Sequence, residues 1–512
     1  MNTFLWGWLQ IVIALPVAGS IGLLCCGLTA RAGEQTLQAQ PQNAPTGWLA
    51  HQFNAASTDE RHQGEHPKDE GLNNGSGQPS IVPANPVPIE LFAGNGDLGR
   101  ALGIKPESGI RFGGSFVSDV TNFLAGSFAP NASFGNGIAL LQLEANLHTL
   151  LGIKDSKISV AGLQFNGSPV NFYSGSIQGL NDLPSTPPYN RTELYTYWIS
   201  KGFPSNRLHI RAGKMVANTL FNNVVLGNQD HPSRAELAVS GLTYVPLFVN
   251  PTLYNRLPAS YNSALGLTAQ WFLNGNGNTY VNYGVFDGNG ARYGYQTGLA
   301  LPKINSYLFQ ILETGVRWNI GPQKLPAKFA LGAWYQSGEL ATPQSQQNLR
   351  LTGSTGGATA NGAAGLYFYG SHRLWYQRPW KDPSGVSMFY QFGWTPSDAT
   401  IVQTFAGGGL TAFGLLKGRP HDNFGLGLAY SIPNSNKYPA LFVLPALFPG
   451  QYKHSAPLSK QIGTPELMVQ LYYQFHVARG TFLEPSITYI PKPSLIGDQS
   501  TLAAGLRLIK LF

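Results

Sequence analysis

The sequence predicts an all-β protein, a transmembrane antiparallel β-barrel of about 16 strands with a short N-terminal helix and a disordered N-terminal tail. Three observations lead to this fold class. Charged residues make up only 11% of the chain, against roughly 25% in soluble domains. No stretch after residue 30 holds the roughly 18 consecutive apolar residues that a membrane helix needs. From residue 109 onward apolar and polar residues alternate, as in strands that face lipid on one side and a lumen on the other.

Residues 1–32 are predicted to be a secretory signal peptide. Residues 4–28 are apolar and small, and Ala30-Arg31-Ala32 supplies the small-x-small pattern of a cleavage site. Because no Lys or Arg precedes the apolar part, an uncleaved anchor is the alternative. The only cysteines, Cys25 and Cys26, lie in this segment, so the mature chain would suit an oxidising periplasm.

Residues 33–88 are predicted to be a disordered periplasmic tail, and residues 89–108 a short helical lead-in. The tail is rich in Gln, Asn, Pro, Gly, Ser and charged residues, and such a composition buries too little apolar area to offset the entropy cost of ordering. In the lead-in, Asp97 is a plausible N-cap for a helix over Leu98–Lys105.

Residues 109–512 are predicted to form the barrel. Successive side chains of a strand point to opposite faces, so alternation gives each strand one apolar and one polar face. A soluble sandwich also alternates, but here the polar face has few Lys and Glu, and aromatic residues cluster at segment ends, where membrane interfaces would lie. The alternation is clearest in four segments: Leu141–His148, Arg207–Ala212, Leu312–Ile320 and Val469–Val477.

Turns and loops divide these segments. Runs rich in Gly, Pro and Ser at Ala341–Gly365 and Pro433–Pro465 are predicted to be extracellular loops. With roughly 25 residues for each strand and its share of loop, residues 101–512 accommodate about 16 strands, an even number as in other such barrels. The chain ends in a strand that carries Leu506 and Leu508 on one face and closes with Phe512. Lys510 on that face is unexpected and is tolerable only near the membrane surface, where its charge can reach water.

The formal charge is unevenly distributed. The total is +8, of which residues 1–32 contribute +1 and residues 33–100 contribute −5, so residues 101–512 carry +12. Such an excess of Lys and Arg favours anions if it lines the lumen, or lipopolysaccharide phosphates if it lies on the outer rim.

Several motifs over residues 95–512 together resemble the carbohydrate-selective porin family of the OprB type. One precedes the first predicted strand, two lie in early strands, one is a turn followed by a strand, and two lie in the last predicted hairpin. They are Gly96-Asp97-Leu98-Gly99-Arg100, Glu193–Trp198, Arg207–Lys214, Gly418–Gly427, Phe482–Pro493 and Gly505-Leu506-Arg507.

The resemblance implies a passive channel for small carbohydrates, such as mono- and disaccharides, without a cofactor. A sugar-selective lumen needs hydrogen-bonding side chains beside aromatic rings. Arg207 and Arg211 form the best candidate pair, since they lie on one face with His209 between them. By strand parity the candidate lumen residues are Glu144, Glu193, Tyr195, Arg207, His209, Arg211 and Arg317.

Two other functions remain open from the sequence. The first is an anion- or phosphate-selective porin, which the basic barrel favours. The second is an outer-membrane barrel hydrolase, although no Gly-x-Ser-x-Gly, His-Glu-x-x-His or Walker motif occurs, and no enzyme activity is expected. The expected partners are small sugars, outer-membrane lipid and lipopolysaccharide, with no nucleic acid and no metal; both a homotrimer and a monomer are compatible with the sequence.

Overall fold

The computed structural model describes residues 96–512 with internal gaps. The predicted signal peptide (1–32), the predicted tail (33–88) and residues 89–95 of the predicted lead-in lie outside the described residues, as do the central parts of the two long predicted loops. The internal gaps are residues 185–188, 204–206, 225–240, 260, 275–276, 289–297, 300–306, 343–358, 380–383, 435–463, 479 and 497–498.

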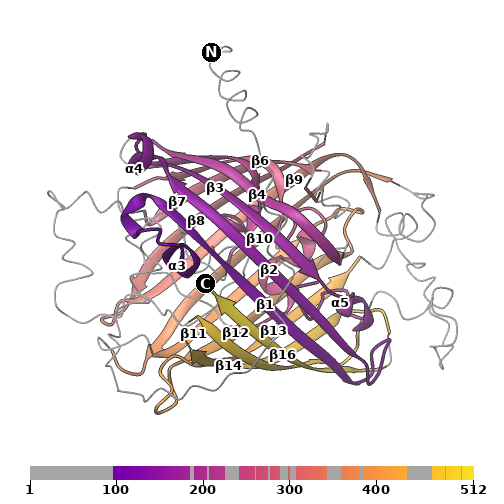
Figure 1. Cartoon of the computed structure of the whole chain (residues 1–512). Coiled ribbons are helices and arrows are strands. Elements are labelled where there is room, and N and C mark those ends of the chain that lie inside the picture. Colours follow the sequence, from indigo (N-terminus) through magenta and orange to yellow (C-terminus); the bar gives the residue numbers. More distant parts are fainter. Residues whose placement is uncertain are drawn as a thin grey trace. The chain divides into compact units, whose positions relative to one another are not determined.

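Within the described part of the chain, sixteen antiparallel strands form one closed barrel (Figure 1). Each strand pairs with its neighbours in sequence, and the first pairs with the last. This arrangement confirms the predicted fold class and strand number. The strands are β1 (Ile110–Ala125), β2 (Ser133–Asn146), β3 (Ser156–Asn166), β4 (Asn190–Gly202), β5 (Leu208–Met215), β6 (Ala264–Phe272), β7 (Thr279–Asp287), β8 (Leu308–Ile320), β9 (Leu325–Ala341), β10 (Thr359–Tyr376), β11 (Gly385–Trp394), β12 (Val402–Phe413), β13 (Asn423–Pro433), β14 (Glu466–Ala478), β15 (Thr481–Ile490) and β16 (Thr501–Leu511).

The described helices are short, and none is long and apolar enough to cross a membrane. The predicted N-terminal helix is present, but its predicted bounds are wrong. It already includes Asp97, with Gly96 at the cap position, and it ends at Ala101 because Gly103 adopts a left-handed conformation (φ +78°). The helices are α3 (Asp97–Ala101), η2 (Pro106–Ser108), α4 (Leu147–Leu151), α5 (Val170–Tyr173), η4 (Ala217–Thr219), α6 (Val245–Phe248) and η5 (Pro251–Leu253).

The predicted strand Leu141–His148 ends earlier than its polarity pattern suggested. The Asn146 side chain accepts hydrogen bonds from the backbone N–H of His148 (3.0 Å) and Thr149 (3.4 Å). This N-cap starts α4. His148 therefore lies in a helix outside the barrel wall rather than on the polar face of β2.

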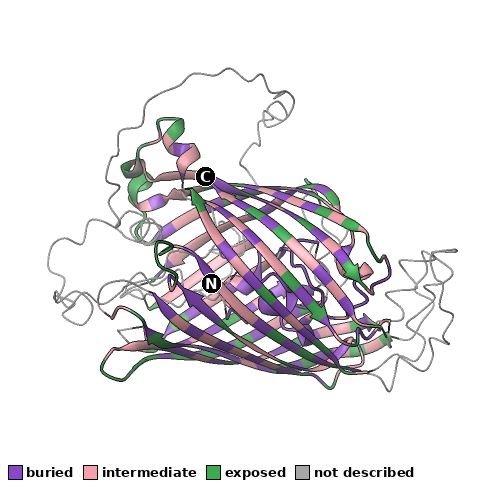
Figure 2. Ribbon diagram, turned by 90° about the horizontal axis from the view of Figure 1, so that it is seen from below, coloured by how far each residue is buried: buried purple, intermediate pink, exposed green. Residues whose placement is uncertain are grey.

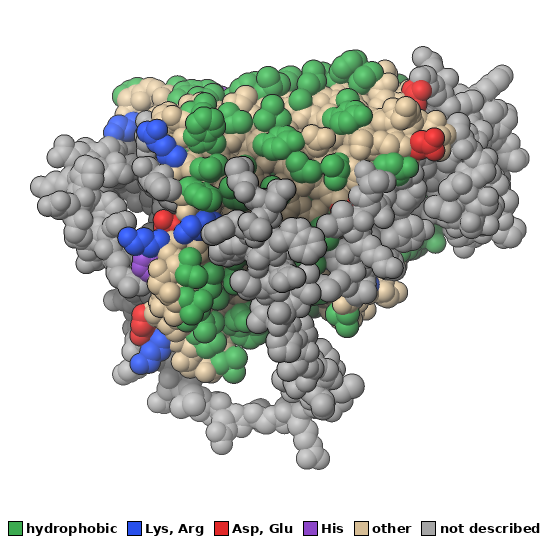
Figure 3. All heavy atoms as spheres, turned by 90° about the horizontal axis from the view of Figure 1, so that it is seen from above, with side chains coloured by type: hydrophobic (Ala, Val, Ile, Leu, Met, Phe, Trp, Pro, Cys, Tyr) green, Lys and Arg blue, Asp and Glu red, His purple; other side chains and the backbone are tan. Residues whose placement is uncertain are grey.

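The two faces of each strand differ as the sequence predicted, and buried and exposed residues alternate along the strands (Figure 2). In β14, Leu467 and Leu471 are exposed whereas Gln470 and Gln474 are buried. Hydrophobic side chains are spread over the outer wall, and charged side chains lie near its ends (Figure 3). The apolar residues thus face outward, where lipid lies, and the polar residues face the lumen.

The two ends of the barrel have connections of different length. At the end that holds α3 and the C-terminus, strands are joined by short segments such as 321–324 and 414–422. At the opposite end the connections are longer, above all residues 216–263 between β5 and β6. Outer-membrane barrels have short periplasmic turns and longer extracellular loops, so we assign the first end to the periplasm.

The barrel closes between β1 and β16. Gly114 and Phe512 exchange two backbone hydrogen bonds, of 2.8 and 3.0 Å, at the periplasmic end of this seam. Lys510, unexpected on the outward face, lies close to the same end and donates to the Thr481 hydroxyl at 3.1 Å.

Replacing Gly114 by Val is expected to lower the yield of closed barrel. A Cβ atom at this position would collide with the Leu140 carbonyl oxygen and the Phe512 ring, so backbone hydrogen bonds of β1 would have to shift. The folded fraction can be measured as the fast-migrating band of unheated protein in SDS gels. Gly103→Val is the control, because no atom lies within 4 Å of its Cβ position, although its positive φ adds local strain. A closed fraction as high in Gly114→Val as in the control would contradict this role of Gly114.

Candidate functional site

Two connections fold into the lumen and narrow it. We call the described residues between β3 and β4, which are 167–184 and 189, the first inner segment. We call the described residues between β5 and β6, which are 216–224, 241–259 and 261–263, the second inner segment. They contact each other: the Tyr254 hydroxyl donates to the Gln178 carbonyl (2.6 Å), and the Asp182 N–H donates to the Thr243 carbonyl (2.8 Å). Tyr254 and Asp182 therefore help to hold the two segments together as one internal structure.

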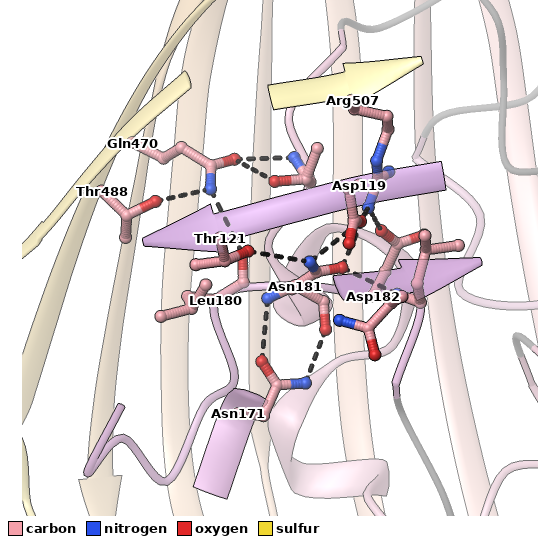
Figure 4. A network of polar contacts seen from close by, with 12 residues as sticks. Asp119, Thr121, Asn171, Leu180, Asn181, Asp182, Gln470, Thr488 and Arg507 are labelled. Carbon is pink, nitrogen blue, oxygen red and sulfur yellow. Dashed lines mark hydrogen bonds and ion pairs between the residues drawn. The ribbon is translucent and has the colours of Figure 1, made fainter. Parts of the chain in front are cut away.

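The first inner segment is bound to the wall by an arginine on the last strand (Figure 4). An Arg507 Nη atom donates to Asp119 Oδ2 of β1 (2.9 Å), to Asn181 Oδ1 (2.9 Å) and to Asp182 Oδ1 (2.7 Å). The Asn181 amide in turn donates to Asp119 (2.9 Å). Burial raises the pKa of the Asp182 carboxyl, and the nearby Arg507 opposes this shift. We call these four residues the Arg507 cluster.

Gln470 of β14 extends this network to the second inner segment (Figure 4). Its side-chain oxygen accepts from the Thr243 N–H (2.6 Å), and its amide donates to the Thr488 hydroxyl (2.8 Å) and to the Leu180 carbonyl (3.3 Å). A small cavity beside Gln470 is lined by polar residues that include Asp119, Thr243 and Thr488. One glutamine thus connects both inner segments to the wall.

Glu466 of β14 forms a second attachment of the first inner segment. Its carboxylate accepts from the Ser176 hydroxyl, from the Ile177 N–H (3.2 Å) and from the Gln178 amide (3.2 Å). It also accepts from the Ser494 N–H at 2.8 Å. Because Glu466 is completely buried, these donors replace the water that a carboxylate would otherwise require.

Glu313 of β8 holds the second inner segment on the opposite part of the wall. It accepts from three tyrosine hydroxyls, those of Tyr280 (3.0 Å), Tyr367 (2.8 Å) and Tyr369 (2.9 Å), and from the Asn222 N–H (2.8 Å). We call these five residues the Glu313 cluster. Sequence patterns did not reveal it, because the tyrosines come from β7 and β10 and meet only across the sheet.

The seven predicted lumen residues fall into different surroundings. Glu193 is buried and paired with Lys214 (2.7 Å) and Arg191 (3.2 Å), and Tyr195 beside it is 1% exposed. Both therefore form part of the packed wall. Glu144 lies 3.6 Å from Lys157, near the periplasmic end of β2.

Three more of the predicted residues also lie toward the periplasmic end. Arg317 lies over the Tyr280 ring at 5.0 Å, and His209 packs edge-on against Phe272. Arg207 is exposed and precedes β5 by one residue. Arg207 therefore lies outside the strand in which it was expected to share one face with Arg211.

Arg211 of β5 lies over the aromatic ring of Trp198 in the neighbouring strand β4. Its guanidinium is 4.3 Å from the centre of the Trp198 ring, and both residues are half-buried. Trp198 pairs with Ser159 of β3, which is fully buried on the lumen side. The register shift between Ala161 and Gly162 is a β-bulge, and such a bulge reverses the parity of later residues in β4. Alternation alone could not have identified Trp198.

In the described part of the chain, no group of three or more His, Cys, Asp or Glu residues could hold a metal ion. The strongest described charge clusters are instead those that attach the inner segments. Each of these carboxylates accepts hydrogen bonds from protein donors, which indicates a role in holding the inner segments against the wall.

Comparison with known proteins identifies related sequences and folds. The family described as "Carbohydrate-selective porin, OprB family" matches residues 137–508, whereas no curated protein sequence matches the chain. The structure of Pseudomonas putida OprB at high pH aligns with a TM-score of 0.66 and 18% identity, over 82% of this chain and 98% of that one. The outer membrane channel DcaP of Acinetobacter baumannii aligns with a TM-score of 0.42 and 8% identity, over 79% and 97% of the two chains.

Proposed function

Since this chain belongs to the OprB family of carbohydrate-selective porins and is a carbohydrate porin of the outer membrane, we propose that small sugars cross it passively along the Trp198–Arg211 face of the lumen. No catalytic step is part of this proposal. The two inner segments set the width of the path, and the wall beside them supplies the contacts. Outer-membrane lipid and lipopolysaccharide would contact the outward apolar face.

The stacked Trp198 and Arg211 pair carries the proposal. A sugar presents hydroxyl groups for hydrogen bonds and a C–H face that packs on an aromatic ring, and a guanidinium is a strong hydrogen-bond donor. Arg211 pairs with Thr268 of β6, and His209 pairs with Gln270, so hydroxyl and amide groups continue the same face. Single contacts of this kind are weak, as a pore requires, because tight binding would block passage.

Replacing Trp198 by Ala is expected to weaken sugar block of the channel current about twofold to tenfold, since an aromatic contact contributes about 0.5–1.5 kcal/mol beyond its area. Arg211→Gln is expected to act in the same direction. The measurement is the glucose concentration that produces half of the maximal reduction of channel current in planar bilayers. Trp271→Ala is the matched control, because Trp271 lies on the outward face and is 55% exposed.

Two outcomes would contradict the proposed path. If Trp198→Ala and Trp271→Ala change sugar block equally, sugars do not contact the Trp198–Arg211 face. If the protein shows strong anion selectivity without sugar block, the anion-porin alternative is favoured. Swelling of liposomes in a graded set of sugars measures passage independently of block.

A further inference from the structure

Arg373 of β10 is a buried arginine on the lumen wall that the proposed sugar path does not use. It is 1% exposed, whereas its neighbour Leu374 is 45% exposed on the outward face. Among the described residues, its Nε and one Nη atom have no hydrogen-bond partner, and no carboxylate forms a salt bridge with it. The remaining part of the guanidinium forms a side-chain hydrogen bond with Tyr376. A buried cation without an anion is costly, which indicates that a counter-charge binds here.

Two hydroxyl groups lie in the same row of the sheet. Arg373 pairs with Ser387 of β11, and Ser387 pairs with Thr411 of β12. Side chains of directly paired residues share one face of a sheet, and both residues are 1% exposed. The hydroxyl oxygens of Ser387 and Thr411 also lack a hydrogen-bond partner within the part of the chain that the structure describes. The row therefore presents two guanidinium nitrogens and two hydroxyls that no described residue satisfies.

Aromatic rings flank the guanidinium. The Arg373 Cζ atom is 4.9 Å from the centre of the Tyr376 ring and 5.4 Å from that of Phe413. These residues lie at the periplasmic ends of β10 and β12. Ring faces, hydroxyls and a cation in one place match a solute that carries C–H groups, hydroxyls and a negative charge.

We propose that Arg373, Ser387 and Thr411 form a subsite that binds the carboxylate and adjacent hydroxyls of a sugar acid near the periplasmic end of the pore. The proposal rests on the proposed carbohydrate path and adds a substrate class to it. A carboxylate would accept from the free guanidinium nitrogens, and the two hydroxyls would bind oxygens on the ring of the solute. All three residues are buried in this structure. The Arg373 side chain must therefore move away from the Tyr376 and Phe413 rings before the solute can bind.

The test compares galacturonate with galactose, which differ at one carbon, in planar bilayers at neutral pH. The half-blocking concentration in the unmodified protein is expected to be about fivefold lower for galacturonate, because a charged hydrogen-bond partner binds more strongly than a neutral one. Arg373→Gln is expected to bring the two concentrations together. Arg378→Gln removes the same charge from the same end, but Arg378 donates to the Gly414 carbonyl, so this control should keep the preference.

Ser387→Ala keeps the test decisive if Arg373→Gln does not fold. The Ser387 hydroxyl has no partner among the described residues, so its loss should leave the barrel intact and still weaken galacturonate block about threefold. Equal block by both sugars in the unmodified protein, or a preference that survives Arg373→Gln, would overturn the subsite and leave water as the partner of these groups. Block by neutral galactose in the same experiment reports separately on the carbohydrate path.

Discussion

Arg507→Ala is expected to destabilise the barrel by about 3–5 kcal/mol and to widen the pore. The replacement leaves the carboxylates of Asp119 and Asp182 buried without their cation, and breaking a buried ion pair from one side costs about this much. The free-energy cost falls when the first inner segment leaves the wall, because the Asp182 carboxylate then reaches water. Both effects follow from the same three hydrogen bonds of the Arg507 cluster.

The first effect is measured as the urea midpoint of unfolding in detergent or lipid, and the second as single-channel conductance. Asp182→Asn is the matched comparison. It retains an acceptor for Arg507 while removing one charge, so its loss of stability should be smaller. Normal conductance in Arg507→Ala, with only the urea midpoint lowered, would show that the cluster stabilises the wall without controlling the inner segment.

Glu313→Ala is expected to cost at least about 3 kcal/mol and to release the second inner segment. Three tyrosine hydroxyls and the Asn222 N–H would lose their acceptor, and each buried donor without a partner costs about 1–3 kcal/mol. Glu313→Gln keeps the shape and one acceptor oxygen, so a milder effect is expected.

Passage of larger sugars through liposome-reconstituted protein measures the release of this segment. Tyr367→Phe, which removes one donor to Glu313, can be compared with Tyr283→Phe, whose hydroxyl donates to Gln310 (2.8 Å) on the exposed face. The first should change the size limit for sugars and the second should not. An equal effect of both would locate the cause outside the Glu313 cluster.

The barrel itself was largely predictable, because alternation reports directly on which face meets lipid. In β14 the exposed leucines and buried glutamines have the predicted parity, and local turn residues separate the strands. Helix ends were less predictable. Asp97 is a residue type that is common at the N-cap, but in the structure it is the first residue of the helix. The left-handed Gly103 beyond the helix determines where α3 ends.

The constriction was not predictable from periodicity. The Trp198–Arg211 contact depends on one bulge in β4, which changes parity without a clear mark in the sequence. The contact between Asp182 and Arg507 joins residues 325 positions apart, and no local pattern encodes such a pair. Glu193 shows a further limit of periodicity, since alternation gives no sign that its carboxylate is paired with Lys214.

The attachments of the inner segments also bear on the order of assembly. Ser176, Asp182 and Thr243 bind Glu466, Arg507 and Gln470, which belong to strands near the end of the chain. A barrel without β14 and β16 would lack these partners, so the inner segments would not be held against its wall. A chain that ends before β14 would therefore keep both inner segments but lose the side chains of Glu466, Gln470 and Arg507 that attach them to the wall.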